Sequence, residues 1–245
     1  MYQVKFYTGE YSTRQRAANR DKCVAYVEQH FNAATTTANY VVVVTGANAS
    51  ETSKTWGRSY AQRISDVFKI PMAGTGRSGI LVGGWNGRGN ANLKYTDMPA
   101  ILLEPLFVSN PTQAEWVRSE EGQNKLAKVL ADSIIDFFPS GGLIAFSVGH
   151  KYKTRRPNDR GAAVYGGGTE ADYAEIVLEK AKNILETYDP AQQYDDAPEN
   201  GDEEIYAHHI MVVKDNKEIW VHTDVDEDDE VMWDAENRIL YITTL

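Results

Sequence analysis

The sequence predicts an α/β fold, a three-layer sandwich with a central, mostly parallel sheet and helices on both faces. Short apolar runs alternate with amphipathic stretches over the first 188 residues, as strands and helices do in this class. Several of these runs are apolar throughout, which is typical of strands buried on both faces. A short β-like region at the C-terminal end predicts an additional small β-rich subdomain.

Five apolar runs are the expected strands of the central sheet, at residues 4–7, 24–27, 40–44, 101–104 and 143–148. Helices are expected over residues 54–68, 121–138 and 172–186. In the last of these, apolar residues recur at helical spacing, so that one face can cover the sheet. Residues 73–92 are rich in glycine and contain Trp85. This composition disfavours a helix and predicts a mobile loop, beside whatever site the sheet carries.

Charge divides the chain into two parts. From Asp189 onward there are 17 acidic and 3 basic residues, a net charge of −14, whereas the residues before it carry a net charge of +4. A mildly basic part suits an anionic polymer, and the acidic part argues against nucleic acid as the main partner. The sequence therefore predicts a main domain at residues 1–188, an acidic linker at 189–202 and an acidic β-rich subdomain at 203–245.

The acidic subdomain carries no clear chemical motif. Strands are expected at residues 210–213, 219–221 and 239–243, with Asp215-Asn216 as a turn. Acidic residues at positions 224, 226, 228, 229 and 230 lack the glycine and terminal glutamate of an EF-hand loop, which favours a solvated acidic face over calcium binding. The histidines at positions 208, 209 and 222 are expected to be structural or exposed. Targeting to a polymer, oligomerisation and covering the basic main domain are the alternative roles for this subdomain.

Membrane insertion and disulfide chemistry are not expected. The sequence has no apolar run of transmembrane length, and residues 1–10 lack the basic and apolar regions of a secretory signal. Its single cysteine, Cys23, lies in an apolar strand-like run and is expected to be a small buried residue. We therefore expect a soluble globular protein without an internal disulfide.

Two histidines follow predicted strands directly. His30 comes just after the run at 24–27, and His150 just after the run at 143–148. Ligands of open α/β sheets bind at the carboxyl ends of the strands, so these two imidazoles could meet at one metal ion. Taken singly, a histidine in such a place is more often a structural residue with ordinary hydrogen bonds.

Two glutamates could complete such a site. Glu170 opens the helix at 172–186 and could be the third protein ligand of a catalytic zinc, although a glutamate also stabilises a helix start electrostatically. Glu104 ends an apolar strand with no ion-pair partner nearby in the sequence. A desolvated carboxylate beside a metal could accept a proton from water and later deliver it to a leaving nitrogen.

The residues around these candidates form three motifs. The first runs from Met98 to Pro111 as Met-Pro-Ala, an aliphatic run, Glu104 and Phe-Val-Ser-Asn-Pro. The other two are Arg14, Ala18-Asn19 and His30-Phe31-Asn32-Ala33, and Gly149-His150, Asp159-Arg160-Gly161-Ala162 and Glu170. In these motifs the chain resembles the zinc-dependent N-acetylmuramoyl-L-alanine amidases, particularly the catalytic domains of phage endolysins.

The resemblance implies an activity and a set of roles. Zinc would be held by His30, His150 and Glu170, and Glu104 would act as the catalytic acid and base. The reaction would be hydrolysis of the amide between N-acetylmuramic acid and L-alanine in bacterial peptidoglycan. Three basic residues near the site, Lys153, Arg155 and Arg156, could hold peptide carboxylates or could form a solvated loop. The alternatives are an inactive wall-binding or phage structural module and another zinc peptidase of peptidoglycan.

The order of the motifs departs from the family. The motif of His150 stands first in the family but follows the glutamate motif here, which implies a circularly permuted chain. Such a permutation can keep every element in place, because the ends of a compact domain often lie close together. Lys151-Tyr152 replace the glycine pair of the family. An endolysin-like protein without a signal peptide would accumulate in the host cytoplasm and reach the cell wall at lysis.

Overall fold

The computed structural model of the chain describes residues 1–189, 210–214, 217–221, 229–234 and 239–244. It divides into two compact units, residues 1–190 and 191–245. Among the described helices, none is both long enough and apolar enough to pass through a membrane.

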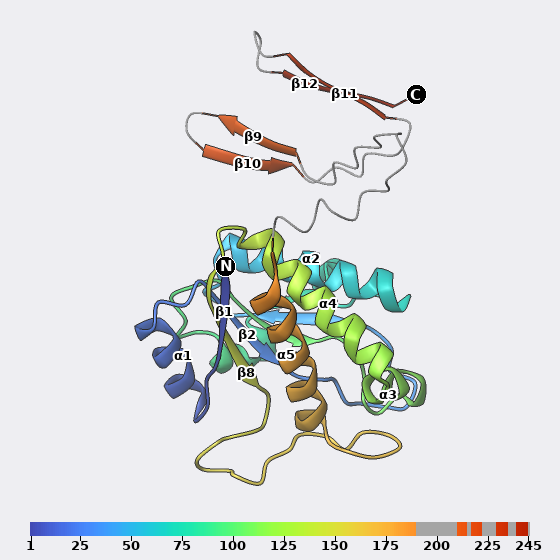
Figure 1. The fold of residues 1–245 in the computed structure, drawn as a ribbon. Helices are drawn as coiled ribbons and strands as arrows, with labels where there is room; N and C mark the ends of the chain where they lie inside the picture. The colour runs from blue at the N-terminus through green and yellow to red at the C-terminus, as the bar shows by residue number, and fades with distance from the viewer. Residues whose placement is uncertain (190–209, 215–216, 222–228, 235–238, 245) are drawn as a thin grey trace. The chain divides into compact units, whose positions relative to one another are not determined.

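The first unit is built on a six-stranded sheet with the order β1-β8-β2-β7-β3-β4 (Figure 1). Four strands, β1, β8, β2 and β7, run parallel to one another. The other two, β3 and β4, are parallel to each other and run antiparallel to those four. The predicted α/β class with a mostly parallel central sheet is thus confirmed. The strands are β1 (Tyr2–Phe6), β2 (Ala25–Gln29), β3 (Val42–Thr45), β4 (Ile80–Val82), β7 (Ala100–Glu104) and β8 (Gly142–Val148).

Five of these strands coincide with the five predicted runs, and β4 was not predicted. It lies inside the glycine-rich segment that was expected to be a loop, where Ile80-Leu81-Val82 pair with β3. Three β-prone residues are enough for an edge strand when a neighbouring strand offers its free side. The same segment also forms a short hairpin of β5 (Gly84–Trp85) and β6 (Arg88–Gly89), and two 3-10 turns at Thr75–Arg77 and Asn90–Asn92.

Five helices accompany the sheet: α1 (Tyr11–Arg20), α2 (Glu51–Phe68), α3 (Pro111–Arg118), α4 (Glu120–Phe137) and α5 (Glu170–Thr187). Local capping explains several of their starts. The side chain of Ser50 accepts a hydrogen bond at the start of α2, and Ser119 does the same at the start of α4. Asn110 caps α3, whose first residue is Pro111. The helices predicted at 54–68, 121–138 and 172–186 are α2, α4 and α5.

The sheet buries both of its faces. One face packs against α2, α4 and α5 in the larger core, which includes Trp56, Leu130 and Leu178. The other face carries a smaller core in which Ala18 of α1 and Leu93 meet the strands at Tyr26, Val44 and Leu102. Burial on both faces explains why the strands read as continuous apolar runs. Cys23 is buried in this smaller core, as predicted.

Three adjacent parallel strands end together at one edge of the sheet. Their register pairs Gln29 of β2 with Leu103 of β7 and with Val148 of β8. The residues that come next along each chain segment are therefore His30, Glu104 and the Gly149-His150 pair. Parallel pairing alone brings these three segments to a common edge, where ligands of such sheets bind.

The two ends of the first unit lie against each other. The rings of Tyr2 in β1 and Tyr188 after α5 have centroids 5.8 Å apart. The amide of Val4 donates to the Glu186 carboxylate at 3.0 Å. At the same end, α4 leads into β8 through a turn at residues 138–141, and the Tyr2 hydroxyl donates to the Phe138 carbonyl at 2.9 Å.

The described part of the second unit consists of two antiparallel strand pairs. One is formed by β9 (Ile210–Lys214) and β10 (Lys217–Val221), the other by β11 (Asp229–Asp234) and β12 (Ile239–Thr244). The strands predicted at 210–213, 219–221 and 239–243 correspond to β9, β10 and β12. The expectations for the linker after residue 189, the Asp215-Asn216 turn, the acids at 224, 226 and 228, and the histidines at 208, 209 and 222 lie outside the described residues.

Candidate metal centre

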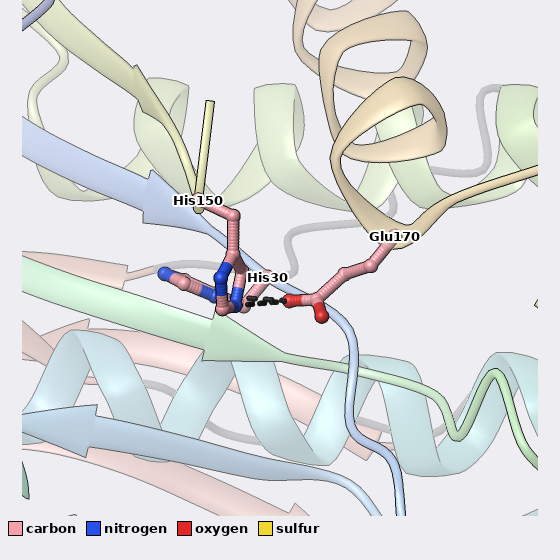
Figure 2. A group of neighbouring side chains, drawn as sticks. All are labelled: His30, His150 and Glu170. Carbon is pink, nitrogen blue, oxygen red and sulfur yellow. Dashed lines mark hydrogen bonds and ion pairs between the residues drawn. The ribbon is translucent and has the colours of Figure 1, made fainter. Parts of the chain in front are cut away.

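Three of the predicted site residues converge at the common edge of β2, β7 and β8. His30 follows β2, His150 follows β8 and Glu170 is the first residue of α5. One ligand atom from each lies within 4.8 Å of the others. Figure 2 shows the two imidazoles side by side with the Glu170 carboxylate approaching them from the start of the helix. The sequence-predicted ligand set is thus assembled from segments that lie up to 140 residues apart.

Each imidazole is held on both sides by a carboxylate. Nδ1 of His30 lies 3.0 Å from Oε1 of Glu170, and its Nε2 lies 3.0 Å from Oε1 of Glu28. Nε2 of His150 lies 3.3 Å from Oε1 of Glu170, and its Nδ1 lies 3.0 Å from Oδ1 of Asp159. Both rings therefore turn one nitrogen to the shared carboxylate and the other to an orienting carboxylate, the arrangement usual for metal-ligating histidines.

The electrostatics of this cluster favour a cation. Burial alone would lower the pKa of His30, but hydrogen bonds with Glu170 and Glu28 outweigh it and raise that pKa to about 10. Burial would raise the pKa of Glu170, whereas its hydrogen bonds with His150 and His30 bring that pKa well below its usual range. The carboxylates of Glu28 and Glu170 on either side of the His30 ring thus stabilise a positive charge at this ring, carried either by a proton or by a metal ion.

The loop after β8 supports His150 through a second carboxylate. Asp159 accepts hydrogen bonds from Nζ of Lys153 at 2.9 Å and from the amide of Gly161 at 3.1 Å. Burial opposes its ionisation, but these donors lower the pKa of Asp159 to about 2. Lys153 is itself buried by this contact. It is therefore committed to positioning Asp159, whereas Arg155 and Arg156 remain exposed on the same loop.

Glu104 differs from the three candidate ligands in that its side chain has no hydrogen-bond partner among the described residues. It is the last residue of β7, and burial raises the pKa of its carboxyl, with the charge of His30 acting in the opposite direction. Within the part of the chain that the structure describes, no hydrogen bond or ion pair holds this side chain. A carboxylate that is desolvated, close to the ligand cluster and otherwise uncommitted is suited to proton transfer.

Three residues of the centre were given no role from the sequence, although one of them, Arg14, stands in the motif of His30. Glu28 carries the orienting carboxylate of His30, and Asn92 and Arg14 contact that carboxylate from two other segments. A signal for Glu28 was present, because residues two apart in a strand face the same side and Glu28 stands two before His30. The expected strand ended at residue 27, which hid this relation. Asn92 offered no signal within its glycine-rich surroundings.

A comparison with known protein families identifies the family of the chain. A family model described as N-acetylmuramoyl-L-alanine amidase, the Amidase_3 family, matches residues 3–136 of the 245 residues. The chain therefore belongs to the Amidase_3 family of N-acetylmuramoyl-L-alanine amidases. The matched segment contains His30 and Glu104, whereas His150 and Glu170 lie beyond it. No curated protein matches the chain.

Several solved structures resemble the chain at low identity. The catalytic domain of the amidase CwlV from Bacillus (Paenibacillus) polymyxa var. colistinus is 22% identical with a TM-score of 0.44, over 53% of this chain and 66% of that chain. An amidase from Clostridium difficile 630 is 23% identical with a TM-score of 0.45, over 54% and 67% of the two chains. Ami1 from Mycobacterium smegmatis is 22% identical with a TM-score of 0.40, over 53% and 61%. The chain thus spans about two thirds of the length of the first of these structures.

Proposed function

We propose that this protein is a zinc-dependent amidase that hydrolyses the bond between N-acetylmuramic acid and L-alanine in bacterial peptidoglycan. One observation carries the proposal. In a chain of this family, His30, His150 and Glu170 converge within 4.8 Å near the partly buried carboxylate of Glu104. There are two alternatives. A wall-binding module would bind peptidoglycan without cutting it, and a peptidase would cut a different bond of peptidoglycan.

The residues present suit zinc. Two imidazole nitrogens and one carboxylate oxygen are a common set of protein ligands at catalytic zinc sites, and they leave a further coordination position free. The second nitrogen of each ring is already satisfied by Glu28 or Asp159, so the nitrogens that face Glu170 are the ones available to an ion. When bound, zinc would supply Lewis-acid polarisation of the amide carbonyl and of water.

Glu104 supplies the proton chemistry in this proposal. Its carboxylate takes a proton from the water that attacks the amide carbon. It then delivers that proton to the nitrogen of L-alanine as the C–N bond breaks, which leaves a free amine and the carboxylic acid of the muramic acid lactyl group. The same group can perform both steps because nothing else in the described chain binds its oxygens. Its raised pKa brings it nearer to the range in which acid and base catalysis are both efficient.

A permuted order of the family's elements is part of the proposal. The family model ends at residue 136, before the segment that carries His150 and Glu170. In the structure this segment continues directly from α4 through the turn at 138–141, and its last helix ends against β1. A cut before β1 and a link between α4 and β8 would therefore convert the family's order into this one without moving an element.

The proposed role is cell-wall lysis of the endolysin type, which the likeness of the three motifs supports. The substrate would then be reached from the cytoplasm of a bacterial host once its membrane is opened. Bacteria that express the chain should lyse when the membrane is permeabilised chemically, and bacteria that express Glu104→Gln should not. Equal survival of the two cultures after permeabilisation would count against a lytic role.

Zinc dependence is tested by removing and restoring the metal. Purified protein treated with a chelator should lose the release of soluble fragments from dye-labelled peptidoglycan, and stoichiometric zinc should restore it. Glu104→Gln should bind zinc as tightly as the wild type yet remain at least roughly a hundredfold less active, the usual loss with a general base. Activity that survives chelation, or that survives in Glu104→Gln, would contradict the proposed mechanism.

A further inference from the structure

We propose that Glu28 is a positioning residue of the metal centre: it fixes the tautomer of His30 so that the ring binds the metal through Nδ1, and it couples His30 to His150 through Arg14. This inference rests on the proposed metal site. It goes beyond it by assigning a function to a buried charge network outside the ligand set.

Glu28 is fully buried in β2, and every side of its carboxylate is occupied. Oε1 accepts from the Asn92 amide and contacts Nε2 of His30 at 3.0 Å. Oε2 accepts from the Tyr26 hydroxyl at 3.3 Å and lies 3.7 Å from Nη1 of Arg14. Because donors contact both of its oxygens, the Glu28 carboxylate cannot rotate freely. It therefore fixes the orientation of the His30 ring, whose Nε2 it contacts.

The contact dictates which ring nitrogen carries the proton. Because Oε1 of Glu28 is an acceptor, Nε2 of His30 must donate to it. In a neutral ring this leaves the lone pair on Nδ1, which is the nitrogen that faces Glu170 at 3.0 Å. His150 has the opposite arrangement, since its Nδ1 faces Asp159 and its Nε2 faces Glu170. The structure thus assigns Nδ1 of His30 and Nε2 of His150 as the metal-binding atoms.

Arg14 extends the network to the second histidine. Its guanidinium lies on the Oε2 side of Glu28 and is itself completely buried. Nη1 donates to the Val148 carbonyl at 3.1 Å, and Nη2 donates to the Lys151 carbonyl at 3.3 Å. These two carbonyls flank His150, whose backbone φ is 61°. One buried ion pair therefore anchors both the ring of His30 and the turn that presents His150.

Replacing Glu28 by glutamine keeps the shape of the side chain but removes its charge and one of its two acceptor oxygens. The amide NH₂ of the new residue would face Arg14 in one orientation, and His30 with the Asn92 amide in the other. Either orientation sets the NH₂ group against a donor, so glutamine cannot accept from Asn92 and His30 on one side and face the Arg14 cation on the other. The ring of His30 would then lose the fixed acceptor that keeps its proton on Nε2 and its lone pair on Nδ1. Glu28→Gln should therefore weaken zinc binding by roughly tenfold to a hundredfold, as loss of an orienting carboxylate commonly does.

The experiment measures zinc affinity without substrate, by competition against a zinc-binding dye. Glu28→Gln should show the loss above, and Asp136→Asn should bind zinc like the wild type. Asp136 on α4 is a suitable control because it forms a partly buried ion pair with Arg63 on α2. Its replacement therefore also breaks a carboxylate–arginine pair. Neither residue of this pair belongs to β2 or β8, the strands that His30 and His150 follow. Glu28→Gln that binds zinc within threefold of the wild type would overturn the proposal.

A second measurement uses the wild type and so does not depend on how the variant folds. Nitrogen-15 chemical shifts of the histidine rings, recorded with zinc bound, should show His30 protonated at Nε2 and metallated at Nδ1. Metal on Nε2 of His30 would refute the assignment. Both readouts are independent of the amidase assay: a protein that binds zinc in this way but cuts no peptidoglycan would contradict the proposed function and leave the role of Glu28 intact.

Discussion

Gly149 shows how closely single residues fit around the candidate metal centre. A Cβ atom at this position would lie 2.5 Å from Cε1 and 2.6 Å from Nδ1 of His30, and 2.7 Å from the Gln29 carbonyl oxygen. At Gly161, where φ is 71°, a Cβ would collide with the Glu170 carboxylate. The absence of a side chain at these two positions is therefore what lets the backbone close around the candidate ligands His30 and Glu170.

Gly149→Ala should displace His30 and reduce zinc affinity by roughly tenfold or more, because a ligand held out of position loses much of its coordination energy. Dye competition measures the change. Gly87→Ala is the control: its φ of 84° makes the substitution strained as well, but nothing lies within 4 Å of the added Cβ. Equal zinc affinity of Gly149→Ala and the wild type would show that His30 is not a ligand or that the ring can move without cost.

Individual site residues could be predicted from the sequence where they stand just after the end of a predicted strand. His30 and His150 could be singled out because each directly follows an apolar run, and the structure brings them together with Glu170. The partners of Glu28 could not be found this way. Arg14 and Asn92 are 14 and 64 residues from it in sequence, and only the packing of α1 and of the glycine-rich segment against the sheet brings them to its carboxylate.

At the scale of elements, the junction of β1 with α4 and α5 closes the first unit. Tyr2 is buried there against Tyr188, and its hydroxyl donates to the Phe138 carbonyl at 2.9 Å. Burial raises the pKa of Tyr2 to about 12 from the ordinary 10.0. The protonated hydroxyl is thus favoured by folding, so its contribution to stability is complete below pH 10 and is lost as the pH rises from 10 to 12.

Tyr2→Phe should lower the free energy of unfolding at neutral pH by about 1 kcal/mol, the usual value of one hydrogen bond. The difference between variant and wild type should shrink as the pH rises from 10 towards 12. Urea unfolding at several pH values measures both effects. Tyr165→Phe serves as the control, because this exposed tyrosine should show neither. A difference that is constant across the alkaline range would mean that the Tyr2 hydroxyl does not titrate with folding.

Element prediction was best for long periodic segments. The helices α2, α4 and α5 and five strands could be placed because their apolar spacing is long or continuous. The edge strand β4 could not, since three residues between glycines show no period and pair only because β3 offers a free edge. In the second unit β11 was missed for a similar reason, as its acidic residues Asp229, Glu230 and Asp234 obscure a short apolar centre.

At the scale of the whole molecule, the first unit has hydrophobic cores of its own. Both hydrophobic cores of the described chain are made by residues before position 190, and so are all the proposed metal ligands. The net charge of −14 from Asp189 onward sets the rest of the chain apart physically. The change of charge at Asp189 predicts a domain boundary there.

Residues 1–190 alone should therefore fold and keep amidase activity within roughly threefold of the full chain on soluble muropeptides, because ordinary surface truncations leave a separate core intact. Thermal unfolding and the rate of muropeptide cleavage check the two parts of this prediction. Cooperative unfolding with activity lost would place a catalytic contribution in the second unit. Failure to unfold cooperatively would show that the first unit depends on the second.

The most direct test of the account identifies the bond that is cut. Zinc-loaded protein is incubated with a defined muropeptide, and the products are analysed by mass spectrometry, with Glu104→Gln as the control. We expect an intact glycan bearing a free lactyl carboxyl group together with a peptide that has a new L-alanine amino terminus, and neither product from Glu104→Gln. Cleavage between amino acids would instead make the protein a peptidase, and no cleavage of any wall type by the zinc-loaded wild type would contradict an enzymatic function.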